Sequence, residues 1–212
     1  MKTPPLPISA EAHKWDQKYA DQSFFYGLEP NDFLKHALQT YPIHGEVLSC
    51  GEGEGRNALY MAQSGLTVSA LDQSAVGLHK ASTLLAQHDL PLQTILADLS
   101  HYAFEDHRWD AIVLIWCHLP QALRAQVHQH ILRSVKPGGY VILECYRPEQ
   151  LTLGTGGPRS LDLLPTAEDL RREFSGLTMR ELNVCERVVQ EGQGHQGRSA
   201  VLQMVAYKST EL

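Results

Sequence analysis

Short apolar runs alternate with amphipathic segments along most of the chain, and this alternation predicts an α/β fold. Five apolar runs have the length of strands, and they cover residues 47–50, 66–71, 92–97, 109–116 and 141–146. Segments with helical periodicity lie between or after these runs, at 57–62, 75–88, up to Ser134, and 166–174. Strands separated by helices form parallel sheets. The run at 109–116 is apolar at nearly every position, so it is expected to be central and buried on both faces.

The two ends of the sequence add helices before this core and a hairpin after it. Ser9 caps a predicted helix that ends at Tyr19, and a second helix is expected at about 31–41. Two alternating segments around a glycine-rich turn predict the hairpin; they cover 177–191 and 198–208, with the turn at 192–197. Three other segments are expected to be irregular: a proline-rich lead-in at 1–8, a turn at 135–140 and a flexible loop at 146–159.

Composition places the chain among ordinary globular proteins. Its 212 residues are 43% hydrophobic and 20% charged, with a formal net charge of −6. A negative protein does not favour a nucleic-acid backbone, so no nucleic-acid partner is expected. No apolar run approaches the ~20 residues that span a membrane, and the first residues lack the apolar core of a signal peptide. Four widely spaced cysteines predict reduced thiols in the cytoplasm, with no disulfide and no metal site. Because no long apolar run is present, no membrane contact is expected either.

The chemistry is centred on the glycines of Gly51-Glu52-Gly53-Glu54-Gly55, where the first strand gives way to a helix. Glycine permits positive φ and lets a ligand approach the main chain. The helix start adds unpaired N–H groups and the positive end of a dipole. A dinucleotide fingerprint needs its third glycine three residues after the second, and here it comes after two. The turn suits a nucleotide-like ligand, although glycines also occur in tight bends that bind nothing.

This spacing resembles motif I of the class I S-adenosylmethionine-dependent methyltransferases. The strings W-x3-Y at Trp15 and Tyr19 and Y-G-x-x-P-N at 26–31 are similar to the N-terminal segment of tellurite-resistance and thiopurine type small-molecule methyltransferases. The resemblance covers residues 12–208. It departs from the family at Ser49, where the family usually has an Asp that helps to orient the loop and the cofactor.

The resemblance implies S-adenosylmethionine as the cofactor and a doubly wound, Rossmann-like sheet of seven strands. The implied strand order is 3-2-1-4-5-7-6, with the last strand antiparallel. One domain is expected over 1–212, with a cap segment at 1–42, a cofactor-binding core at 43–147 and a substrate loop and hairpin at 148–212. In the family relatives the cap segment closes on cofactor and substrate; the alternative is a helical cap that only packs its aromatic side chains on the core.

Two acidic residues at strand ends carry the prediction of the cofactor site. Asp72 follows Gly51 by 21 residues, and a carboxylate at this place in a Rossmann-like unit can bind both ribose hydroxyls. The resemblance assigns the adenine amino group to Asp98. The alternatives are a helix cap for Asp72 and an ordinary turn residue for Asp98. The expected cofactor-binding residues are Trp15, Tyr19, Tyr26, Gly27, Gly51, Glu52, Gly53, Asn57, Asp72, Gln73, Asp98, Leu99, Ile115 and Trp116.

The sequence defines the part of the site that would bind the methyl acceptor less well than the cofactor part. It does not identify a catalytic residue. Candidates for binding the acceptor are His118, Tyr146, Arg159 and His195. His118 is the tentative catalytic base because imidazole titrates near pH ~6.5, although a loop histidine is more often structural. The Asn/Asp-Pro-Pro-aromatic motif of many nitrogen methyltransferases is missing after the fourth strand, which argues against adenine or amide acceptors.

The predicted function is in-line methyl transfer from S-adenosylmethionine to a small molecule, at sulfur, selenium, tellurium or oxygen, by a monomer or homodimer. One alternative is a cofactor-binding protein of the same fold without activity, suggested by Ser49. A second alternative is an NAD(P)-dependent oxidoreductase, which the glycine spacing and the final hairpin disfavour.

Overall fold

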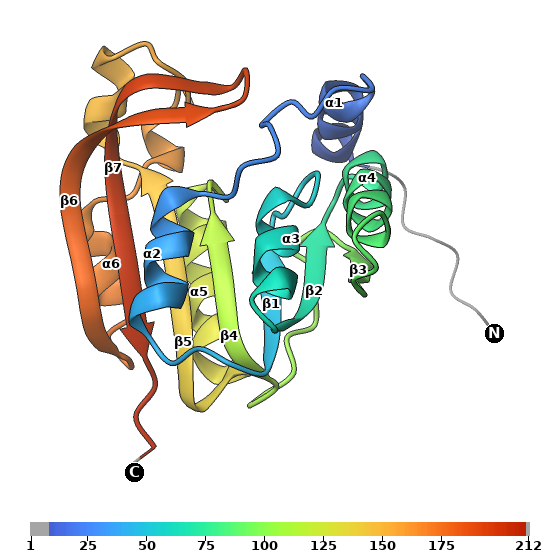
Figure 1. The fold of residues 1–212 in the computed structure, drawn as a ribbon. Coiled ribbons are helices and arrows are strands. Elements are labelled where there is room, and N and C mark those ends of the chain that lie inside the picture. Colours follow the sequence, from blue (N-terminus) through green and yellow to red (C-terminus); the bar gives the residue numbers. More distant parts are fainter. Residues whose placement is uncertain (1–8, 211–212) are drawn as a thin grey trace.

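A computed structural model describes residues 9–210, whose seven strands form one sheet between two layers of helices (Figure 1). The strand order is β3-β2-β1-β4-β5-β7-β6, which confirms the expected topology. Strands β1 to β5 are parallel, and β7 runs antiparallel to both β5 and β6. The strands are β1 (Glu46–Cys50), β2 (Thr67–Asp72), β3 (Gln93–Leu96), β4 (Trp109–Ile115), β5 (Val135–Tyr146), β6 (Thr178–Glu191) and β7 (His195–Tyr207).

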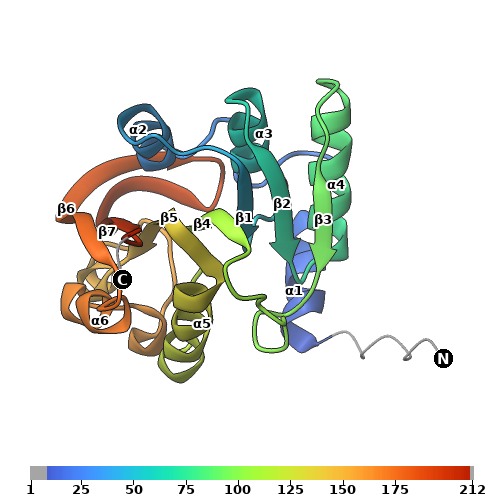
Figure 2. The ribbon, with the colours of Figure 1, turned by 90° about the horizontal axis from the view of Figure 1, so that it is seen from below.

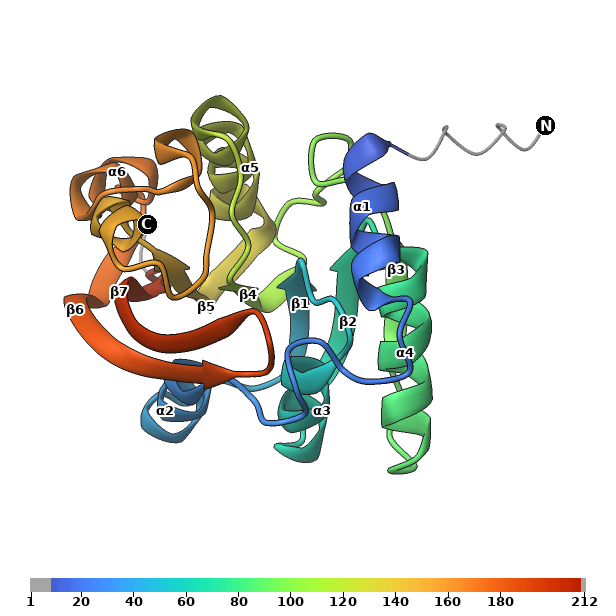
Figure 3. The ribbon, with the colours of Figure 1, turned by 90° about the horizontal axis from the view of Figure 1, so that it is seen from above.

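The helices cover both faces of the sheet. Helices α2 (Asp32–Thr40), α3 (Arg56–Gln63) and α4 (Ala75–Ala86) lie on one face, and α5 (Gln121–Ser134) and α6 (Ala167–Glu173) lie on the other (Figure 2). Helix α1 (Ala10–Tyr19) lies above the carboxyl ends of β2 and β3 and packs against α4 (Figure 3). The connection after β5 holds two short 3-10 helices, η1 (Pro148–Thr152) and η2 (Leu161–Leu163).

Most apolar residues of the sheet belong to two core clusters, one under each helical layer, while Tyr146 and Val201 belong to a third, smaller cluster. Leu34, Met61 and Leu85 fill the layer of α2, α3 and α4. Ile131 and Phe174 fill the opposite layer, under α5 and α6. Strand β4 supplies residues to both clusters, as its nearly continuous apolar sequence predicted.

The turn expected at 135–140 is instead part of strand β5. Val135 already pairs with Trp109, and the register then shifts before Tyr140 pairs with Ala111. Gly138 has a φ of +85°, which gives the strand a local irregularity. These glycines therefore lie within an irregular strand, where a turn between helix and strand was expected.

The final hairpin is longer than expected because its strands pair as far as Glu191 and His195. We call the three residues between them, 192–194, the hairpin tip. The hairpin curls over the carboxyl edge of the sheet and ends beside the segment that joins α1 to α2 (Figure 3). We call this segment, residues 20–31, the cap loop. His195, the first residue of β7, is thus brought to the same edge of the sheet as the glycine turn.

Two other expectations concern the whole chain. All four cysteines, at positions 50, 117, 145 and 185, are free thiols. Within residues 9–210 no helix combines the length and apolarity that crossing a membrane requires. The expected lead-in at 1–8 lies outside the described residues.

Candidate active site

The glycine turn, residues 51–55, joins β1 to α3 at the carboxyl edge of the sheet. The backbone N–H groups of Gly51 and Glu52 both donate to Leu71 O, at 2.8 and 3.2 Å, which ties the turn to the end of β2. Gly53 has a φ of +65°, and a Cβ there would lie 2.7 Å from the Tyr19 hydroxyl. Only glycine combines this conformation with the close approach of the ring.

Glu52 supplies the carboxylate that Ser49 lacks. Ser49 Oγ donates a short hydrogen bond to Glu52 Oε2, and Ala58 N donates to Glu52 Oε1 at 2.9 Å. Glu52 therefore caps α3, whose N-cap residue Gly55 has no side chain to do so. Burial raises the pKa of Glu52 to about 7. The side chain of this predicted cofactor residue is thus committed to the turn itself.

Asp72 lies where the sequence placed it, at the end of β2 beside the glycine turn. One carboxylate oxygen accepts from Gly53 N and the other from Ser74 N, each at 2.8 Å. The side chain is buried, and this burial raises its pKa above the ordinary value. Gln73 follows it, half-buried.

Asp98 ends β3 at the same edge and makes a local turn. Its Oδ1 accepts from Ser100 N at 2.8 Å and from Ser100 Oγ at 2.7 Å, while Leu99 packs against the core. Asn57 Oδ1 accepts the N–H of Asn31 at 3.0 Å. Asp98 is half-buried, and one of its two carboxylate oxygens is hydrogen-bonded. Asn57 connects α3 to the start of α2.

The cap loop is held over the glycine turn by a buried ion pair that the sequence did not reveal. Glu54 accepts the N–H of Phe25 at 2.8 Å and is paired with Lys80. The Lys80 ammonium also donates to the backbone oxygens of three residues around the start of the cap loop: Tyr19, Asp21 and Ser23. Glu54 and Lys80 are 26 residues apart and belong to no common pattern, so no sequence signal pointed to the pair.

Three predicted aromatic residues of the N-terminal segment meet above the turn. Trp15 stacks on Tyr19 with ring centroids 5.6 Å apart, and Tyr19 contacts Tyr26 edge-on at 6.5 Å. Tyr19 is buried. Gly27, with a φ of +73°, lies next to Gly192 of the hairpin tip, so the cap loop also touches the hairpin.

A row of stacked rings, which we call the aromatic stack, continues from Tyr26 across the ends of β4 and β5. His195 stacks on Tyr26 at 4.7 Å and lies 4.9 Å from Trp116. Trp116 stacks on Tyr146 at 4.5 Å, and Tyr146 on His118 at 5.6 Å. The stack joins residues of the cap loop, the β4 end, the β5 end and the start of β7.

The end of β4 also touches the glycine turn. A Cβ at Gly51 would lie 3.2 Å from Cys117 Sγ, directly after Trp116. Trp116 has a φ of +56°, which is uncommon for a large residue and marks a constrained turn. Ile115, the last residue of β4, is buried in the core behind it.

Below the stack, two buried carboxylates are neutralised by two arginines. Glu144 accepts two hydrogen bonds from Arg187, at 2.8 and 2.7 Å. Glu191 is paired with Arg56 and accepts from Trp116 Nε1 at 2.6 Å. Burial alone would raise the pKa of Glu191, but the Arg56 charge and the hydrogen bonds hold it below its ordinary value. Asn31 Nδ2 bonds to both carboxylates and links them to α2.

His118, the tentative catalytic base, has both ring nitrogens engaged by the main chain. Nδ1 lies 3.0 Å from Trp116 O, and Nε2 accepts the N–H of Tyr146 at 3.0 Å. Burial lowers the pKa of His118 to about 4. With no free nitrogen, His118 is a structural group that fixes Trp116 relative to Tyr146, and it offers no lone pair to an acceptor.

The other three acceptor candidates differ in burial. Arg159 is exposed. Tyr146 and His195 are buried and joined by a hydrogen bond of 2.8 Å between Tyr146 Oη and His195 Nδ1. His195 thus folds inward, while its hairpin neighbour Arg198 points to solvent and pairs with Glu186.

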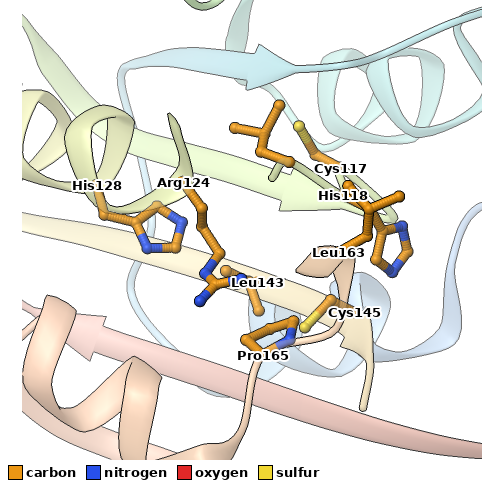
Figure 4. Close-up of a pocket in the computed structure, with 9 residues that line it drawn as sticks. Cys117, His118, Arg124, His128, Leu143, Cys145, Leu163 and Pro165 are labelled. Carbon is orange, nitrogen blue, oxygen red and sulfur yellow. The ribbon is translucent and has the colours of Figure 1, made fainter. Parts of the chain in front are cut away.

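A small pocket opens on the α5 side of the sheet (Figure 4). His118, Arg124 and His128 are among its lining residues, and the last two bond to Glu173, at 3.1–3.2 Å for Arg124 and 2.8 Å for His128. These bonds tie α5 to α6 and satisfy the buried carboxylate. Among residues 9–210, no group of three or more His, Cys, Asp or Glu side chains is arranged to hold a metal ion.

A doubly wound sheet of this order, with a glycine turn after β1 and an acidic residue at the end of β2, defines the class I methyltransferase fold. Residues 47–139 match the family described as Methyltransf_25, methyltransferase domain. This match covers less than half of the chain, so residues 47–139 are similar to a methyltransferase domain, in agreement with the fold.

Curated relatives are similar to part of this chain. A 2-heptyl-1-hydroxyquinolin-4(1H)-one methyltransferase of Mycobacteroides abscessus is 30% identical over 119 residues, which cover 54% of this chain and 52% of the relative. The matched segment of this chain spans about half of the length of this relative, and less than half of the length of a second curated relative.

Solved structures share the fold. TehB from Haemophilus influenzae has a TM-score of 0.68 at 18% identity, covering 94% of this chain and 67% of TehB. A protein solved in a study of disulfide-to-thioacetal conversion during echinomycin biosynthesis has a TM-score of 0.76 at 17% identity, covering 95% and 94%.

Proposed function

We propose that this protein transfers a methyl group from S-adenosylmethionine to a small, planar aromatic acceptor, at an oxygen atom. The single observation that carries the proposal is the aromatic stack, which begins beside the glycine turn and ends at the carboxyl end of β5. Flat π-faces favour planar ligands, and they also attract a sulfonium cation.

The residues at this edge fit the cofactor. The three glycines of the turn carry no side chain that would block a ligand. Asp72 offers a carboxylate to hydroxyl groups beside the turn. Trp15, Tyr19 and Tyr26 close the space from above, and Gln73, Asp98 and Leu99 flank it at the ends of β2 and β3. The cofactor, when bound, supplies an electrophilic methyl group; the protein's part is to align donor and acceptor and to exclude water.

The acceptor side of the proposal rests on the stack and on one relative. The rings of His195 and Tyr26 are in contact, so an acceptor enters when the cap loop moves away from the hairpin tip. The Mycobacteroides abscessus relative is named for an aromatic N-hydroxy heterocycle. A flat, weakly acidic hydroxyl compound is therefore the acceptor class that we favour over thiols, selenols and metalloids.

Two measurements test the function. Calorimetry with S-adenosylhomocysteine and with NAD should give heat only with the former. Labelled S-adenosylmethionine should then transfer its methyl to members of a panel of phenols, N-hydroxy heterocycles and thiols, with the aromatic hydroxyl compounds preferred. Binding of the nucleoside with no transfer to any acceptor would instead support a binding protein without activity.

A further inference from the structure

We propose that His195 is the general base that removes the acceptor's proton, and that Tyr146 is the residue that positions it. This inference rests on the proposed methyl transfer to an aromatic hydroxyl group. It assigns a catalytic role to the hairpin, which the sequence analysis had connected only with substrate binding.

The ring of His195 is fixed on several sides. Tyr26 stacks on one face at 4.7 Å, and Trp116 lies toward the other at 4.9 Å. Its main chain pairs with Glu191 across the hairpin and with Gly156 of the preceding loop. A base must be held in one orientation to act, and these contacts leave the imidazole little freedom.

The two nitrogens of the ring have different surroundings. Nδ1 is 2.8 Å from Tyr146 Oη, whereas Nε2 has no hydrogen-bond partner among residues 9–210. When Nδ1 carries the ring proton and donates it to Tyr146 Oη, Nε2 presents a lone pair. In this tautomer Tyr146 Oη accepts the hydrogen bond from Nδ1, which leaves Nε2 to accept a proton from the substrate.

The other titratable groups near the site are already engaged. His118 uses both nitrogens on the main chain, and Glu144 and Glu191 are neutralised by arginines. His195 is thus the histidine at this edge whose ring keeps a nitrogen available.

The step balances in atoms and charge. The acceptor O–H gives its proton to His195 Nε2 as the oxygen's electron pair forms a bond to the methyl carbon. The carbon–sulfur bond breaks and leaves its electron pair on sulfur, so a positive charge disappears there while an imidazolium forms. Glu191 lies close enough to favour that imidazolium, and the proton then passes to water.

The pH dependence follows from the groups around the ring. Those facing it are Glu191 of β6, Arg56 of α3, Lys18 of α1, His118, Tyr26 and Tyr146. Burial lowers the pKa of His195 to about 3, and Glu191 opposes this shift. The ring is therefore neutral across the neutral range, so its nitrogen carries no extra proton before the acceptor binds, and Glu191 must favour the imidazolium that forms during transfer.

The test compares His195→Asn on two acceptors: a phenol that is un-ionised at the assay pH and a nitro-substituted phenol that is ionised. We expect kcat to fall about 100-fold or more with the un-ionised phenol. With the ionised one it should fall only about fivefold or less, since no proton remains to be removed. Free imidazole should restore part of the lost rate with the smaller variant His195→Ala.

Controls separate this role from packing and from the proposed function. Both variants should bind S-adenosylhomocysteine as the wild type does, and Arg198→Ala, on the exposed side of the same strand, should change neither rate. Tyr146→Phe should show the same preference for the ionised acceptor, more weakly. Equal losses with both acceptors would overturn the base assignment while leaving the function intact. A wild type that methylates neither acceptor, nor any other on the panel, would overturn both.

Discussion

Lys80 of α4 and Glu54 of the glycine turn form an ion pair under the cap loop, with both side chains largely buried. Lys80 also donates to three main-chain oxygens around the start of the cap loop, so one ammonium group ties this segment to the core. The cap is therefore joined to the predicted cofactor turn by polar contacts as well as by its aromatic residues.

Replacing Lys80 by Met should loosen the cap loop without unfolding the sheet. The change leaves the Glu54 carboxylate buried with no counter-charge, which costs about 3 kcal/mol. Amide hydrogens at 20–31 should exchange about 100-fold faster, while those of β1 and β4 should not change. Lys14→Met, which removes an exposed pair with Glu11, is the matched control. Unchanged exchange in the cap loop would show that Lys80 does not hold it.

Asp72→Asn tests the cofactor site directly. Removing the charge beside Gly53 should weaken S-adenosylhomocysteine binding by about 10- to 100-fold, since hydrogen bonds to charged groups contribute about 1.5–3 kcal/mol. Calorimetry measures the change. Asp106→Asn, on an exposed pair with Arg133, should bind as the wild type does. An Asp72 variant with wild-type affinity would show that the carboxylate only shapes the turn.

Glu191→Gln should destabilise the protein strongly. The change leaves Arg56 without its buried partner and weakens the contacts of Trp116 and Asn31. A loss of about 3–5 kcal/mol in the free energy of unfolding is expected from denaturant titration.

A matched control for Glu191 lies on the same strand. Glu186 makes an exposed pair with Arg198, and Glu186→Gln should change the unfolding free energy by less than about 1 kcal/mol. Similar effects of the two substitutions would mean that the buried network contributes little.

Two buried groups with opposite shifts should give the protein a broad stability maximum between about pH 4.5 and 6.5. Glu52 has a folded pKa of about 7, raised by burial from 4.5, so the folded state binds its proton more tightly. Stability from this group is complete below about pH 4.5 and is lost as pH rises through 7. Glu52→Gln should therefore add up to about 3 kcal/mol at pH 8 and little at pH 4.

The contribution of His118 to stability depends on pH in the opposite direction. Its folded pKa is about 4, lowered by burial from 6.5, so its contribution is present above pH 6.5 and is lost as pH falls through 4. Urea titrations at pH 4, 6 and 8 on wild type and Glu52→Gln distinguish the two effects. A wild type that is more stable at pH 8 than at pH 6, with no gain from Glu52→Gln, would contradict the assignment for Glu52.

The sequence predicted most strands and the place of the glycine turn because these depend on local signals, whereas the strand order came from the resemblance to class I methyltransferases. Continuous apolar runs, glycine spacing and the acidic end of β2 each lie within a few residues. At 135–140 the local signal misled, because pairing with β4 keeps these glycines in a strand.

The rest of the site depends on residues that the sequence separates widely. Asn31 meets Glu144, which is 113 residues away, and Arg56 meets Glu191, which is 135 residues away. No periodicity connects such partners; only the folded sheet does. His195 was a candidate from the hairpin turn alone, whereas its bond to Tyr146 required the curl of the hairpin. Ser49 looked like a lost carboxylate, yet Glu52 three residues later supplies one.

The cap loop and the hairpin tip meet through the hydrogen bond from Gln193 N to Phe25 O, at 2.8 Å. During synthesis on the ribosome, the glycine turn emerges long before β7. The nascent chain can then fold its parallel strands, but its aromatic enclosure stays unfinished until residue 195 has left the exit tunnel. A chain cut short before β7 would therefore lack both this contact and the His195 ring that stacks on Tyr26.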